Sequence, residues 1–87
     1  MKTEKLRKLV INHLGNDEGY FNWSWSFIER IVDQAFTVID NGQLVDVQKL
    51  MENSLKQEFP SLGGVYPRII TNRILEFIDN HLAKSYL

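Results

Sequence analysis

The sequence predicts an all-α fold, a single small domain of four helices packed as an orthogonal or an antiparallel bundle. Three observations predict it. Apolar residues recur with helical spacing through most of the 87 residues, and no hairpin pattern joins the two short stretches that could be extended. Segments rich in Gly, Pro and Asn divide the chain into four such stretches. The length fits one domain, residues 1–87, and the sequence contains no internal repeat or linker.

The first two helices are expected at about residues 3–14 and 27–40. Each has an apolar face of residues three and four apart, namely Leu6, Leu9, Val10 and Leu14 in the first and Ile28, Ile31, Val32, Ala35 and Ile39 in the second. Ser26 and Glu29 have the spacing of a capping box, in which the two side chains satisfy N–H groups at a helix start. The sequence therefore places the start of the second helix directly after Ser26.

The last two helices are expected at about residues 47–58, with an alternative start at Leu44, and 67–84, with Asp46 as the cap of the third. Their apolar faces comprise Val47, Leu50, Met51, either Ser54 or Leu55, and Phe59 in the third, and Ile70, Ile74, Phe77, Ile78 and Leu82, widened by Ile69 and Leu75, in the fourth. This width predicts that the fourth helix lies at the centre of the bundle. The alternative is that one edge of it packs on a second copy of the chain, giving a homodimer.

The composition excludes several classes of protein. Without cysteine the chain has no disulfide framework, thiol nucleophile or thiolate metal site. Its apolar runs are no longer than three residues, whereas a membrane span needs about 20. The start of the chain is basic but has no apolar segment of the kind that a secretory signal contains. We therefore expect a cytoplasmic protein without a membrane span.

Catalytic and metal-binding patterns are also missing from the sequence. His13 and His81, the two histidines, stand near the ends of predicted helices and outside any H-x-x-x-H pattern. No serine lies in a G-x-S-x-G motif, and the segment that starts at Asp40 lacks the acidic alternation of a calcium loop. We therefore expect no enzyme activity, no metal ion and no cofactor.

Aromatic residues are concentrated before the second helix, where Tyr20, Phe21, Trp23 and Trp25 lie within six residues. A chain this small cannot bury four such rings, so we expect at least one in the core and others on a partner. Trp and Tyr are frequent interface anchors because they bury a large area at little entropic cost. The loop that ends at Tyr66 is a second apolar candidate surface. These five residues predict a non-enzymatic protein-binding module, a regulator or inhibitor that docks on another protein.

A small helical DNA-binding transcriptional regulator is the alternative. Arg68, Asn72 and Arg73 lie close together at the start of the fourth helix and are suited to phosphates and base edges. Against it, the net charge is −1, and the charges form basic ends, +3 over residues 1–8 and +1 over 67–87, around a middle of −5. Broad electrostatic binding of nucleic acid relies on a basic face. The protein-binding hypothesis is therefore preferred.

Overall fold

The computed structural model describes residues 2–16, 23–40 and 46–85, and this part of the chain contains four α-helices, one short 3₁₀-helix and no strand. The helices are α1 (Lys2–Gly15), α2 (Trp25–Asp40), α3 (Val47–Glu58), η1 (Pro60–Leu62) and α4 (Tyr66–Ser85). The all-α fold class is confirmed, and every α-helix begins and ends within two residues of the expected position.

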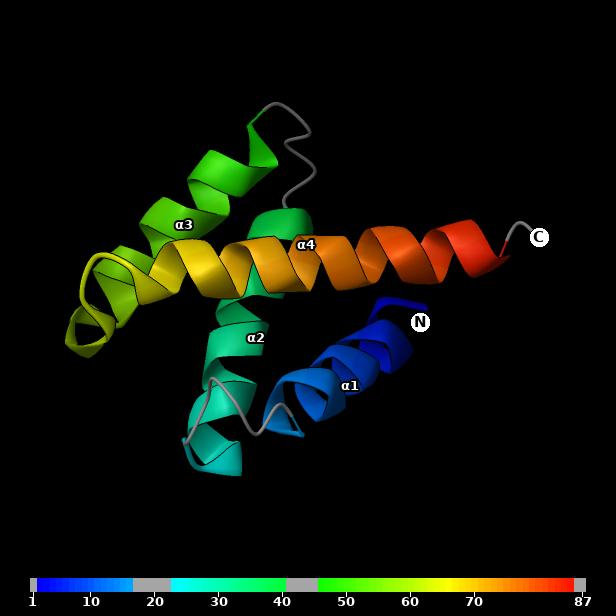
Figure 1. The fold of residues 1–87 in the computed structure, drawn as a ribbon, viewed down its shortest axis with the longest axis horizontal. Helices are drawn as coiled ribbons and strands as arrows, with labels where there is room; N and C mark the ends of the chain where they lie inside the picture. Colours follow the sequence, from blue (N-terminus) through cyan, green and yellow to red (C-terminus); the bar gives the residue numbers. More distant parts are fainter. Residues whose placement is uncertain (1, 17–22, 41–45, 86–87) are drawn as a thin grey trace.

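The helices are arranged around α2 (Figure 1). Both α1 and α3 pack against α2, and α4 packs mainly on α3 with a smaller contact to α1. Figure 1 shows α3 running back beside α2, while α4 runs across α2 rather than along it. Of the two packings that the sequence left open, this crossing is that of an orthogonal bundle.

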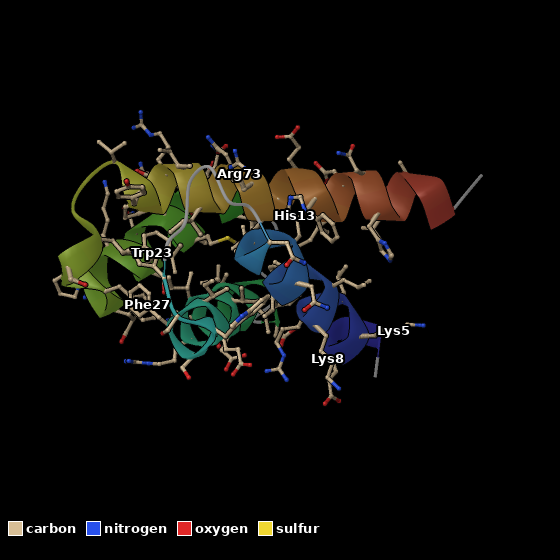
Figure 2. The ribbon with its side chains drawn as sticks, turned by 60° about the horizontal axis from the view of Figure 1, so that its bottom comes forward. Lys5, Lys8, His13, Trp23, Phe27 and Arg73 are labelled. Carbon is tan, nitrogen blue, oxygen red and sulfur yellow. The ribbon has the colours of Figure 1, made fainter. Side chains whose placement is uncertain are left out.

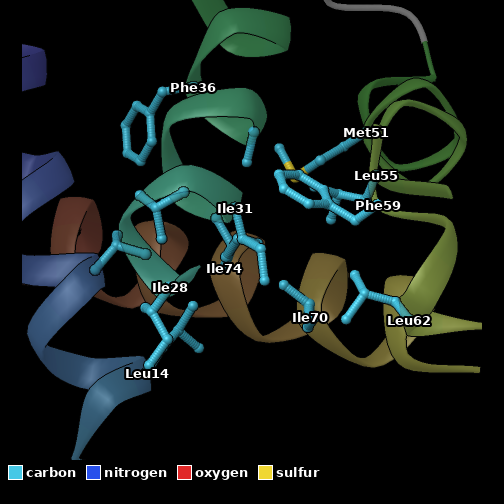
Figure 3. Close-up of a cluster of buried hydrophobic side chains, with 13 residues drawn as sticks. Leu14, Ile28, Ile31, Phe36, Met51, Leu55, Phe59, Leu62, Ile70 and Ile74 are labelled. Carbon is cyan, nitrogen blue, oxygen red and sulfur yellow. The ribbon is translucent and has the colours of Figure 1, made fainter. Parts of the chain in front are cut away.

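The core draws on every helix, as Figure 3 shows. Its buried apolar residues are Val10 and Leu14 of α1, Ile28, Ile31, Val32, Ala35 and Phe36 of α2, Met51 and Leu55 of α3, Phe59, Leu62 of η1, and Ile70 and Ile74 of α4. Most of them belong to the predicted apolar faces, so burial follows the helical period.

The helix at the centre is α2 and not α4, which corrects the expectation from the width of the fourth stripe. Five residues of α2 are buried, whereas the stripe of α4 becomes exposed toward its C-terminal end. Phe77 and Ile78 are half-buried and Leu82 is 46% exposed. The reason is length, because α4 has 20 residues and its last turns extend beyond α2 (Figure 1).

The start of α2 differs from the predicted capping box. The helix already begins at Trp25, and the Phe27 N–H donates a hydrogen bond of 3.2 Å to Ser24 Oγ. The backbone carbonyl of Ser24 accepts from the Ile28 N–H at 3.1 Å. Ser24 is therefore the N-cap, and the assignment of that role to Ser26 was wrong because Ser26 lies inside the first turn.

The expectation that the Asp46 side chain caps α3 is also wrong. Asp46 does occupy the N-cap position, but its backbone is left-handed (φ 57°, ψ 39°) and its side chain makes no capping hydrogen bond. A side-chain cap normally needs extended backbone angles at this position. Only the carbonyl of Asp46 contributes, by accepting from the Leu50 N–H at 2.9 Å.

Two polar side chains between the helices differ in whether they form hydrogen bonds. Gln34 of α2 donates a hydrogen bond of 2.7 Å to the hydroxyl oxygen of Ser54 on α3. In contrast, Thr71 of α4 is fully buried, and its hydroxyl has no hydrogen-bond partner in the described part of the chain. Burial of an unpaired hydroxyl costs about 1–3 kcal/mol.

We predict that Ser24→Ala lowers the free energy of unfolding by about 1 kcal/mol, because the Phe27 N–H then loses its acceptor. Ser26→Ala is the matched control. It should change this free energy by less than about 0.5 kcal/mol, since Ser26 is exposed. Urea denaturation followed by circular dichroism measures both variants. A larger loss in the Ser26 variant than in the Ser24 variant would contradict the observed helix start.

We predict that Thr71→Val raises the free energy of unfolding by about 1 kcal/mol, because it removes the unpaired buried hydroxyl while keeping the shape of the side chain. For a domain of this size the melting temperature should rise by about 4–8 °C. Thr37→Val is the control, because Thr37 is exposed and its hydroxyl donates to the Asp33 carbonyl. An unchanged or lower melting temperature for the Thr71 variant would mean that its hydroxyl is satisfied.

Candidate docking groove

Four aromatic side chains make a continuous series of ring contacts from the core to the surface. The Phe59 ring at the end of α3 meets Phe27 of α2, with centroids 5.6 Å apart. Phe27 meets Trp23 at 5.6 Å, and Trp23 meets Tyr66 at the start of α4 at 5.5 Å. All three contacts are edge-to-face, which is a favoured geometry for aromatic pairs. Phe59 is 6% exposed and Tyr66 is 42% exposed, so the series leads outward.

An open groove of about 570 Å³ lies along the outer part of this series. Its lining combines aromatic and aliphatic carbon with the hydroxyl groups of two serines and one tyrosine, from Trp23, Ser24, Phe27, Ser61, Leu62 and Tyr66. The start of α2, η1 and the start of α4 thus contribute to one surface. Val65, directly before Tyr66, is 69% exposed. Figure 2 shows Trp23 and Phe27 next to each other, away from Lys5 and Lys8 of α1.

The structure brings together two of the five residues predicted to bind a partner, Trp23 and Tyr66. Trp25 lies apart from them and is 49% exposed. Its ring packs so closely on Gly15 of α1 that a Cβ at position 15 would overlap it. The other two, Tyr20 and Phe21, lie outside the described residues.

The sequence interpretation did not assign Phe27 or the two serines to the binding surface. Phe27 is three residues from Ser24, so both lie on one side of α2 once the helix is known to begin at Trp25. This signal was present in the spacing, but the predicted capping box started the helix at Phe27 and left Ser24 outside it. Ser61 carries no comparable signal, since it joins the groove only through the position of η1.

The residues of the DNA-binding alternative do not form one surface. Arg68 and Asn72 face α3, where Asn72 Oδ1 accepts a hydrogen bond of 2.6 Å from Gln48 and Arg68 Nε lies 3.6 Å from a carboxylate oxygen of Glu52. Arg73 instead lines a depression with residues of α4 and with His13 of α1. Figure 2 labels Arg73 on α4 and His13 on α1. A phosphate beside Arg68 would therefore meet the negative charge of Glu52.

Both histidine rings are stacked with the same phenylalanine. The His13 ring stacks on Phe77 at 4.6 Å between centroids, and His81 lies parallel to Phe77 at 6.3 Å. His13 is exposed and His81 is half-buried. The His13–Phe77 contact joins the C-terminal end of α1 to α4, whereas His81 and Phe77 are neighbours within α4.

Aromatic and aliphatic side chains and hydroxyl groups make up the groove lining. Among the described residues that line it there is no carboxylate, imidazole or amine. Among the described residues, no three His, Asp or Glu side chains are placed to hold a metal ion. None of the helices in residues 2–16, 23–40 and 46–85 combines the length and apolarity that a bilayer span requires. The chain matches no family model, and the curated proteins and solved structures contain no significant match to it.

We predict that Trp23→Ala lowers the free energy of unfolding by about 2–3 kcal/mol and that Trp25→Ala lowers it by about 1 kcal/mol. Trp23 packs against the core and borders a small apolar void with Leu14, Ile28 and Ile70, whereas about half of Trp25 is in solvent. Urea denaturation followed by circular dichroism gives both values. Equal or reversed losses would contradict the different burial of the two rings.

Proposed function

We propose that this protein is a non-enzymatic binding module that docks on another protein through the groove lined by Trp23, Phe27 and Tyr66, and that it acts as a regulator or inhibitor of that partner. The observation that carries the proposal is the edge-to-face contact of Trp23 with Tyr66 at an open groove. Two segments that are distant in the sequence contribute partly exposed rings to the same concave surface.

The exposure of the rings supports this function. Tyr66 and its neighbour Val65 are 42% and 69% exposed, so a large apolar area remains in water. Each ring is held in place by its neighbours, and a pre-organised aromatic side chain loses little entropy when a partner covers it. The serine hydroxyls at the groove can direct a partner by hydrogen bonds.

The absence of cysteine makes a direct experiment possible, because a single introduced cysteine carries a photo-crosslinker at one known position. Val65→Cys places the crosslinker beside the groove, and Lys8→Cys places it on the exposed face of α1 as the control. We predict that in an extract of the native host only the Val65 probe captures a defined partner.

A second substitution tests whether capture of the partner depends on the groove. Adding Tyr66→Ala to the Val65 probe should reduce partner affinity about 30-fold, the loss of about 2 kcal/mol expected for an aromatic hot spot. Far-UV circular dichroism verifies that the variant is folded. Capture that is the same from both probe positions, or that persists with Tyr66→Ala, would overturn the proposal.

A further inference from the structure

We propose that the groove binds a short, extended, acidic segment of the partner, with an aliphatic side chain in the corner formed by Trp23 and Tyr66 and a carboxylate on Arg30. This inference rests on the proposed docking function of the same groove and adds the chemistry of the partner. Three features carry it: the angle between the rings, the hydroxyl groups beside them, and the position of one cation.

The angle between the rings favours an aliphatic side chain. The plane of Trp23 is inclined by 73° to that of Tyr66 and by 75° to that of Phe27. Rings at such angles form corners, whereas a flat ring is best held between two parallel walls. A compact side chain such as Leu, Val or Pro fits a corner of carbon faces because it touches both walls at once.

The hydroxyl groups favour an extended backbone. Ser24 Oγ accepts the hydrogen bond from the Phe27 N–H, and its own O–H remains able to donate. Ser61 is exposed at the same groove and adds another donor. An extended segment leaves its backbone carbonyls unpaired and can accept from both. A helical segment would already use those carbonyls internally.

The Arg30 side chain lies next to the aromatic series. The guanidinium of Arg30 lies over the Phe59 ring, 5.6 Å from its centroid, and Phe59 is in contact with Phe27 of the groove. Arg30 follows Phe27 by three residues, so the two side chains are neighbours on α2. Within the described part of the chain Arg30 forms no ion pair. Its charge is therefore available to a carboxylate of the partner.

The nearby acidic residues of α2 do not neutralise this cation. Glu29 projects from the side of the helix opposite Phe27, because successive residues are turned by about 100°. Asp33 is engaged with Arg7 of α1, with 2.7 Å between Asp33 Oδ1 and the guanidinium. Arg30 is thus a positive charge of α2 beside the aromatic series, although the middle of the sequence is net negative. This complementarity selects an acidic segment over a basic one.

The test is a selection of random displayed peptides of about 12 residues, which span about 40 Å when extended, on the immobilised full chain. We expect the enriched peptides to combine an aliphatic residue with Asp or Glu a few residues away. Arg30→Glu should weaken their binding at least about fivefold, since it replaces an attraction by a repulsion at a partly solvated site. Lys8→Glu, the same charge reversal on α1, should leave the dissociation constant within about twofold.

Two further variants separate the possible outcomes. Arg30→Gln removes the charge without reversing it and should give an intermediate loss, while a peptide with Lys in place of its acid should bind Arg30→Glu better than the wild type. Peptides that lose binding with Tyr66→Ala but are indifferent to Arg30→Glu would overturn the acidic partner and leave the docking function intact. No enrichment, or enriched peptides indifferent to Tyr66→Ala, would overturn both.

Discussion

The burial of one face of α2 is the constraint on which the other helices depend. A chain of this size forms a single core, and α2 contributes Ile31, Val32 and Ala35 to it with at most 1% of their surface exposed. Both α1 and α3 lie against α2 because they bury their own apolar stripes there. The same packing positions the first turn of α2, so Phe27 is held at the groove, while Ser24 is placed beside it by its capping hydrogen bond with the Phe27 N–H.

The contacts of the aromatic series link the packed interior to the rings at the surface. Phe59 is almost completely buried, and each following ring is held by an edge-to-face contact with the one before it. Tyr66 is therefore positioned although 42% of its surface is in water. Rigid exposed rings differ energetically from exposed aliphatic residues such as Leu82, because less conformational entropy remains to be lost on binding.

Ion pairs between neighbouring side chains determine which charges remain available to a partner. The net charge of the chain does not show which charges are paired in this way. Arg68 was attractive as a DNA contact in the sequence, yet its guanidinium lies beside the carboxylate of Glu52, which also pairs with Lys56. Arg30 had no predicted role, but the structure places it over an aromatic ring without an acidic partner among the described residues. A cation over a ring face is held in position while its charge remains accessible to solvent.

The sequence by itself determined the fold class, the helix positions and most of the core, because burial repeats with the period of the helix. It also identified Trp23 and Tyr66 as candidates, since large rings in loops of a small protein need another surface to cover them. Only the tertiary structure decided that these two rings meet, that Trp25 instead packs on Gly15, and that α2 rather than α4 is central. Helical periodicity describes one face of one helix at a time, whereas a contact between residues 23 and 66 depends on how whole helices cross.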